Sequence, residues 1–281
     1  MDLTMQRNNT LARTRILRII ATLIFFQAIT FLFTADYSSA ETSEEKGLAI
    51  AVEADRRDTG YGSSTADMLM ILKNRHGQES RREIRFRNLE VEGDGDKSLT
   101  IFDSPGDVKG TAFLNYTHKY GDDDQWLYLP ALKRVKRISS RNKSGSFMGS
   151  EFSYEDITSQ EIEKYTYRWI REEIYEDNDC FVSERYPVDQ KNSGYSRQVV
   201  WIDKEEYRTR KVEYYDRKNM HLKTLTMDNF KKYEDKFWRP LKLYMVNHQT
   251  GKSTILQFSN YKFNVGLTDA DFNKNSLKRA K

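Results

Sequence analysis

The segment RQVVWIDKEEYRTRKVEYY, residues 197–215, indicates the fold class of this protein. Its two halves, 197–202 and 207–215, are rich in valine, tryptophan, isoleucine and tyrosine, which favour β-strands. The four charged residues 203–206 between them have the composition of a turn. In the second half, charged side chains alternate with apolar or aromatic ones, as in a half-buried strand. The segment therefore predicts a β-hairpin.

The same pattern of short strands and polar turns continues over most of the chain from residue 79 onward, and it predicts about ten strands. Two helices are expected before them. One begins near the acidic residues 44–45, and the other covers Thr65–Asn74. A further short helix is expected at 157–163. These elements predict a mainly β (α+β) fold in one antiparallel domain, with a curved sheet whose covered face lies under the N-terminal helices.

The first forty residues have the features of a secretory signal peptide. Four arginines precede an apolar run at 19–33, and Ser38-Ser39-Ala40 offers small residues for cleavage. An uncleaved membrane anchor is the alternative, but the run is shorter than the roughly 20 residues that cross a bilayer. We therefore expect residues 1–40 to be removed near Ala40 during export, and residues 41–281 to form the mature domain.

The composition argues against several functional classes. The 281-residue chain has 46 Lys and Arg against 42 Asp and Glu, and this net charge of +4 gives nucleic-acid binding little support. A single cysteine, Cys180, excludes an internal disulfide and a cysteine-based zinc cluster. The sequence shows no nucleophile–base pair and no set of metal ligands at a suitable spacing. We therefore expect a protein without enzymatic activity, cofactor or metal.

Two motifs connect the chain with a known family. The segments WLYLPALKRVKRI (126–138) and SFMGSEFSYED (146–156) resemble exported proteins of the outer membrane lipoprotein-sorting family, which are relatives of the lipoprotein carrier LolA. The resemblance extends from about Met68 to Phe272. It implies an incomplete β-barrel closed by helices over an apolar cavity. It also implies a periplasmic location, an acylated cargo, and association with RND-type (MMPL-like) exporters of lipids.

These observations together predict a periplasmic carrier or chaperone that holds the acyl chain of a lipoprotein or another lipid during envelope transport. The alternative is a non-enzymatic accessory scaffold that docks to an RND/MMPL-type exporter. The side chains that could line the cavity or its lid are Met68, Leu69, Leu72, Leu114, Trp126, Tyr128, Phe147, Met148, Trp169, Tyr214, Met227 and Met245. The same side chains could instead fill an ordinary core.

Three segments are candidates for moving parts or contacts. The expected helix Thr65–Asn74 is the candidate lid, and the loop Arg141–Glu151 is the candidate gate. A basic run could contact anionic lipid head groups, the membrane surface or an acidic partner, or it could be an ordinary solvated face. This run consists of Lys133, Arg134, Lys136, Arg137, Arg141 and Lys143.

Overall fold

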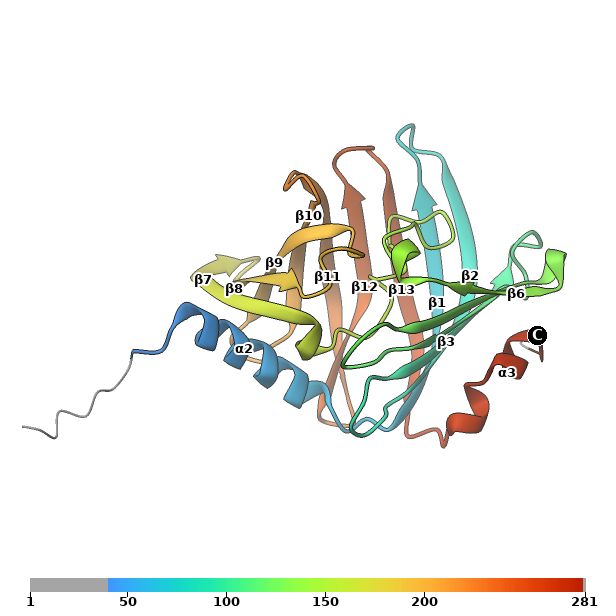
Figure 1. Cartoon of the computed structure of the whole chain (residues 1–281), viewed down its shortest axis with the longest axis horizontal. Coiled ribbons are helices and arrows are strands. Elements are labelled where there is room, and N and C mark those ends of the chain that lie inside the picture. Colours follow the sequence, from blue (N-terminus) through green and yellow to red (C-terminus); the bar gives the residue numbers. More distant parts are fainter. Residues whose placement is uncertain (1–39, 280–281) are drawn as a thin grey trace, which may run out of the picture. The chain divides into compact units, whose positions relative to one another are not determined.

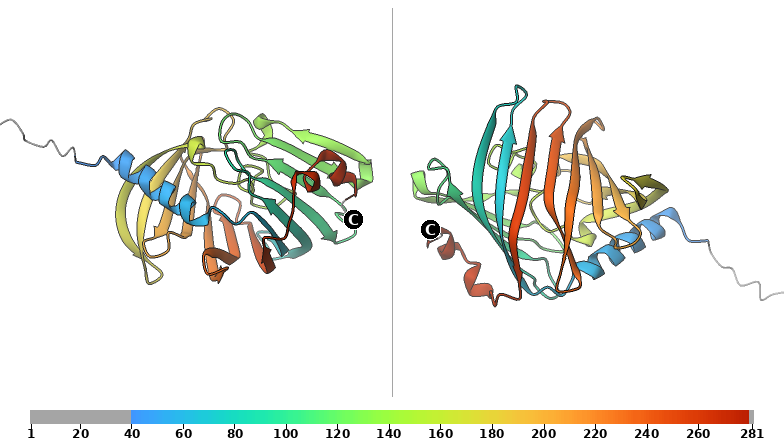
Figure 2. Two further views of the ribbon diagram at one scale, coloured as in Figure 1. Left: turned by 90° about the horizontal axis from the view of Figure 1, so that it is seen from below. Right: turned by 180° about the vertical axis from the view of Figure 1, so that it is seen from behind.

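A computed structural model describes residues 40–279 of the chain. Thirteen strands form one antiparallel sheet in the order β6-β5-β4-β3-β2-β1-β13-β12-β11-β10-β9-β8-β7. Strands β6 and β7 form the two edges and do not pair with each other, so the sheet curves but does not close (Figure 1; Figure 2). The expected signal peptide lies outside the described residues, apart from Ala40.

The strands are β1 (Ser63–Lys73), β2 (Glu79–Leu89), β3 (Lys97–Ser104), β4 (Ala112–Tyr116), β5 (Asp124–Leu129), β6 (Arg134–Ile138), β7 (Tyr165–Tyr175), β8 (Asn178–Pro187), β9 (Tyr195–Asp203), β10 (Thr209–Asp216), β11 (His221–Tyr233), β12 (Phe237–Asn247) and β13 (Ser253–Phe263). The α-helices are α2 (Ser43–Asp58) and α3 (Lys274–Arg279). Short 3-10 turns are η1 (Pro130–Leu132), η2 (Ser140–Asn142), η3 (Ile162–Lys164) and η4 (Asp269–Asp271).

The sheet consists of two meanders that meet at its centre. Strands β1 to β6 follow one another outward to one edge, and β7 to β13 run inward from the other. The meanders join where β1 pairs with β13, with Met70 opposite Leu256. The hairpin expected at 197–215 is formed by β9 and β10, with Val200 opposite Val212. The mainly β, antiparallel class is therefore confirmed, although the sheet has thirteen strands rather than about ten.

One long helix, α2, begins with a signal that is readable in the sequence. The Thr42 hydroxyl accepts the backbone N–H of Glu45 at 3.1 Å, and the Glu45 carboxylate accepts the backbone N–H of Thr42 at 2.8 Å. This reciprocal capping box satisfies two donors that a helix start otherwise leaves unpaired. Acidic residues in the first turn and basic residues in the last turn also suit the helix dipole.

The second expected helix, Thr65–Asn74, is wrong, because these residues form strand β1. Its apolar run is continuous because β1 lies at the centre of the sheet, between β2 and β13. Met68 and Met70 point to one face, and Ile71 is buried on the other. A strand that is buried on both faces does not alternate between apolar and polar residues, so its sequence resembles that of a buried helix. The short helix expected at 157–163 is reduced to the single turn η3.

The two faces of the sheet carry separate apolar clusters. The inner face is the one on which α2 and the crossing segment (residues 139–164, between β6 and β7) lie (Figure 2). Its core includes Met70, Phe102 and Phe113, together with Phe147 from the crossing segment. On the outer face, a second cluster contains Leu277 of α3 and Phe272, which precedes that helix, among residues of β3, β4 and β5.

Within residues 40–279, no helix combines the length and the apolar character that crossing a membrane requires.

Candidate ligand cavity

A cavity of about 1110 Å³ lies between α2 and the inner face of the sheet at the β7–β12 end. Ile50, Ala51 and Ala54 line it from α2. Apolar side chains of the sheet, among them Val200, Ile202, Met227 and Phe230, line it from the other side. The volume is slightly above the range that protein pockets for small molecules usually enclose, about 300–1,000 Å³. The cavity is therefore large enough for an extended apolar ligand.

Helix α2 is held close to the sheet, so it forms the roof of this cavity. Gly47 lies against strand β7, where a Cβ atom would come within 2.7 Å of the backbone nitrogen of Trp169. The Lys46 ammonium lies 3.7 Å from the centroid of the Trp169 ring, a cation–π contact. Near the other end of the helix, Arg57 lies 4.3 Å above the ring of Tyr207, and Asp58 pairs with Arg239.

Carboxylates crowd one end of the cavity, beside the strand ends of β1 to β3. Glu90 accepts the backbone N–H groups of Gly60 and Gly62 at 2.6 and 2.8 Å, and the Tyr61 hydroxyl donates to Asp96 at 2.6 Å. Burial, with the nearby charge of Asp96, raises the pKa of Glu161 to about 7. This end of the cavity therefore disfavours additional negative charge.

Several polar atoms in the cavity wall lack a partner. The Ser183 hydroxyl, the Asn88 side-chain oxygen and the Trp238 indole nitrogen are buried and make no hydrogen bond with any described residue. A buried polar atom without a hydrogen bond is costly, so most such atoms in folded proteins have a partner. These three atoms are therefore positions where a polar group of a ligand, or water, would gain a hydrogen bond.

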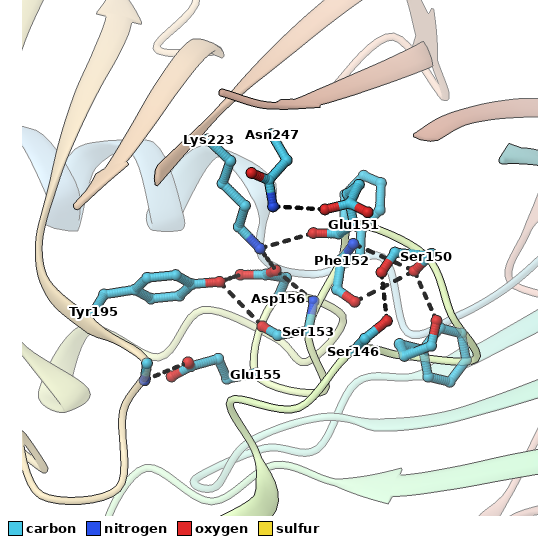
Figure 3. Close-up of polar contacts among 12 residues, drawn as sticks. Ser146, Ser150, Glu151, Phe152, Ser153, Glu155, Asp156, Tyr195, Lys223 and Asn247 are labelled. Carbon is cyan, nitrogen blue, oxygen red and sulfur yellow. Dashed lines mark hydrogen bonds and ion pairs between the residues drawn. The ribbon is translucent and has the colours of Figure 1, made fainter. Parts of the chain in front are cut away.

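The crossing segment is fastened to the inner face by a buried ion pair. The Lys223 ammonium on β11 lies 2.5 Å from the Asp156 carboxylate, and both side chains are almost completely buried (Figure 3). Asp156 also accepts the Tyr195 hydroxyl at 2.7 Å and the backbone N–H of Ser153 at 2.6 Å. Lys223 donates to the carbonyl oxygen of Glu151 at 2.9 Å. The charges are thus both paired and hydrogen-bonded, as a buried ion pair requires.

Further bonds tie the same segment to two neighbouring strands. The Asn247 amide of β12 donates to the Glu151 carboxylate at 2.7 Å, and the Glu151 backbone N–H donates to the Thr254 hydroxyl of β13 at 3.0 Å. The crossing segment is therefore attached to β9, β11, β12 and β13 at once. Its attachment fills the inner face beside the cavity.

The Glu155 carboxyl, next to this ion pair, makes stability depend on pH. Burial, followed by the charge of Asp156, raises its pKa to about 7. A carboxyl whose pKa is raised by folding stabilises the protein below its unfolded pKa, and this contribution is lost as the pH rises through 7. We expect stability to fall between pH 5.5 and pH 8, and Glu155→Gln to reduce that fall.

Urea denaturation of both proteins at the two pH values measures this effect. Glu83→Gln, at an exposed position on β2, is the matched control and should leave the pH dependence unchanged. Equal pH dependence in Glu155→Gln and the unmodified protein would contradict the assignment.

Comparison with known proteins relates this fold to a family. A family model described as "-like: Uncharacterized protein" matches residues 94–279. The crystal structure of a domain from Vibrio parahaemolyticus, named for outer membrane lipoprotein sorting, is 62% identical with a TM-score of 0.82, over 84% of this chain and 100% of that chain. The chain belongs to the family of outer membrane lipoprotein-sorting proteins.

Two further solved structures share this fold. A DUF1329 family protein from Desulfovibrio piger is 34% identical to this protein, with a TM-score of 0.79 over 84% of this chain and 99% of that chain. A LolA superfamily protein from Nitrosomonas europaea is 21% identical, with a TM-score of 0.66 over 82% and 98% of the two chains, and shows the shared fold. No curated protein gives a significant match.

Of the side chains expected to line the cavity, Met227 does so. Leu114, Trp126 and Tyr128 lie on the outer face in the cluster under α3. The inner-face core contains Met68, Phe147, Tyr214 and Met245 as buried members, with Leu72, Met148 and Trp169 packed against it. Leu69 is half-buried on β1 and points to the outer face. Most of these side chains therefore lie in packed apolar clusters rather than in the cavity wall.

The two expected moving segments have different positions in the structure. Thr65–Asn74 cannot act as a helical lid because it is mostly the central strand β1, and α2 covers the cavity instead. In the candidate gate Arg141–Glu151, Phe147 is completely buried. Its ring centroid lies 5.2 Å from that of Phe113 and 5.5 Å from that of Tyr154. This aromatic packing places Phe147 in the core.

The basic run lies on and next to the edge strand β6. Arg137 pairs with Asp124 at 2.5 Å, and Lys143 pairs with Asp189 at 2.8 Å. Four others make no ion pair with any residue of the described part of the chain, and all four are exposed: Lys133, Arg134, Lys136 and Arg141. These four provide unneutralised positive charge at one edge of the sheet.

Sequence reasoning missed two polar residues of the cavity wall, Ser183 and Arg185. Both are on β8, two positions apart, which places them on the same face. The alternation of this strand was visible, but alternation alone does not say which face is the inner one. The sequence alone therefore could not assign Ser183 and Arg185 to the inner face. The pairing of β8 with β7 and β9 makes that assignment.

Proposed function

We propose that this LolA-like protein is a periplasmic, non-enzymatic carrier that holds the acyl chain of a lipoprotein or another lipid beneath α2. The observation that carries the proposal is the cavity of about 1110 Å³ with apolar residues on both its roof and its floor. Burying a methylene group is favourable by about 0.8 kcal/mol, so a long chain gains several kcal/mol by leaving water. Membership of the lipoprotein-sorting family supports the same role.

Uptake and release would involve movement of α2, which residues 59–62 connect to β1. The helix contacts the sheet mainly through β7 at Gly47 and through side chains near its ends. None of these contacts belongs to the hydrogen-bonded strand pairing of the sheet. Displacing α2 would therefore open the cavity while leaving the sheet intact.

Filling the cavity from its roof tests the proposal. Ala54→Trp would place an indole in the cavity, whereas Val52→Trp on the same helix lies at a position that is 44% exposed and outside the cavity lining. With a fluorescent fatty acid and protein purified without detergent, we expect Ala54→Trp to weaken binding by about tenfold or more and Val52→Trp by less than about twofold. Absence of binding by the unmodified protein, or equal binding by all three proteins, would contradict the carrier function.

The exposed basic residues at the β6 edge support a second part of the proposal, a transient contact with an anionic membrane surface. Each Lys or Arg close to such a surface contributes about 1 kcal/mol of attraction, and salt screens it. The alternative role as a docking scaffold for an RND/MMPL-type exporter stays a prediction.

A further inference from the structure

We propose that the cavity selects ligands with an anionic head group, a carboxylate or a phosphate, and that Arg185 binds this group. The inference rests on the proposed carrier function and specifies the class of lipid. Its starting observation is a positive charge in the cavity wall that lacks a counterion. Arg185 lines the cavity, is half-buried, and makes no ion pair with any residue between 40 and 279.

The bonds that Arg185 does make leave most of its guanidinium free. Its Nε donates to the Gln198 side-chain oxygen at 2.7 Å, and the group lies 4.8 Å from the centroid of the Tyr165 ring. These contacts hold the side chain on the inner face but do not neutralise it. A guanidinium has five N–H donors in a planar fork that matches carboxylates and phosphates.

Nearby carboxylates are already bonded to other groups. Glu184 is adjacent in sequence and also borders the cavity, but its carboxylate is paired with Arg168 and Arg197. The buried carboxylate of Asp156 is taken by Lys223, and that of Glu155 accepts the Gly194 N–H at 2.7 Å. No described carboxylate therefore lies within ion-pair distance of Arg185.

A second unpartnered donor lies on the same face as Arg185. The Ser183 side chain is 5% exposed, and its hydroxyl makes no hydrogen bond with a described residue. Residues two apart on a strand are separated by about 7 Å, so one multi-oxygen anion with its first methylene groups can reach both. Val200, which lines the cavity, is directly opposite Ser183 on β9. Anion donors and apolar surface are thus adjacent, which suits an amphipathic anion.

The acidic end of the cavity also favours one orientation of the bound ligand. Glu90, Asp96 and Glu161 line the end beside β1 to β3, where carboxylates outnumber the basic side chains Lys119, Lys236 and Arg239, so this end would repel an anion. Arg185 would attract it at the β7–β9 end. The two effects act in the same direction, so the head group would lie beside β8 and the acyl chain would extend along Ile202 and Met227.

The test compares a fatty acid with the fatty alcohol of the same chain length, which has no charge. For the unmodified protein we expect about tenfold or tighter binding of the acid, because a charge-assisted hydrogen bond is lost with the alcohol. Arg185→Gln should weaken acid binding about tenfold and leave alcohol binding within about twofold, and Arg185→Lys should be intermediate because it lacks the planar fork. Arg87→Gln on the outer face is the matched control and should change neither. Lysophosphatidic acid replaces the fatty acid in a parallel arm, and a preference for either head group supports the inference.

Each other outcome has a definite meaning. Equal binding of acid and alcohol by the unmodified protein, or unchanged acid binding by Arg185→Gln, would overturn the head-group inference while the carrier function stands. Failure of both amphiphiles to bind would overturn the carrier function as well. Inorganic phosphate alone is expected not to compete at the concentrations where the fatty acid saturates. Competition at those concentrations would mean that the site takes a free anion, and would overturn the assignment to a lipid.

Discussion

Replacing Lys223 with methionine is expected to lower the free energy of unfolding by about 3–5 kcal/mol, because it leaves the buried Asp156 carboxylate without its counterion. The Lys223 and Asp156 side chains are 5% and 2% exposed, so water cannot replace the lost partner. Lys223 also bonds the Glu151 carbonyl and lies about 5 Å from the ring centroids of Tyr195 and Tyr214. Loss of the ammonium therefore weakens the attachment of the crossing segment at several points.

Urea denaturation of the single and double variants measures this effect. In Lys223→Met/Asp156→Asn both charges are absent, and we expect its loss of stability to be smaller than the sum of the two single losses. Lys231→Met, at an exposed position on the same strand, is the matched control and should change stability by less than about 0.5 kcal/mol. A loss below about 1 kcal/mol for Lys223→Met would contradict the structural role of the pair.

Replacing Phe147 with alanine is expected to cost about 3–5 kcal/mol, the usual range for removing a buried aromatic ring. The side chain is completely buried, and its ring contacts Phe102, Phe113 and Tyr154 on the inner face. Truncation leaves a cavity that this close-packed aromatic cluster cannot fill without moving strands. The measured loss of stability distinguishes a core role of Phe147 from a role as a gate.

The control for this variant is Leu132→Ala, at a position that is 68% exposed, which should alter stability by less than about 0.5 kcal/mol. Both variants are measured by chemical denaturation and by fatty-acid uptake. If Phe147→Ala kept the stability of the unmodified protein and only accelerated uptake, Phe147 would be a gate after all.

The site was only partly predictable, because its members come from distant parts of the chain. Ala54 and Met227 line one cavity although they are more than 170 positions apart. Lys223 pairs with Asp156, which is 67 positions away, and the sequence around neither residue indicates this pair. Arg185 could not be predicted for another reason. Alternation along a strand defines two faces, but it does not show which face lies under α2.

Local sequence patterns were enough to predict the antiparallel β class, the start of α2 and the family. Each of these depends on local chemistry or on a continuous motif: alternation with polar turns in 197–215, the capping box of Thr42 and Glu45, and the two segments at 126–138 and 146–156. Three other features became known only from the packing of the folded chain: Met68–Leu72 is a strand, Phe147 belongs to the core, and α2 covers the cavity. These features depend on the order of the thirteen strands, because that order buries a central strand on both sides and brings together surfaces that are distant in sequence. No local sequence pattern encodes this order.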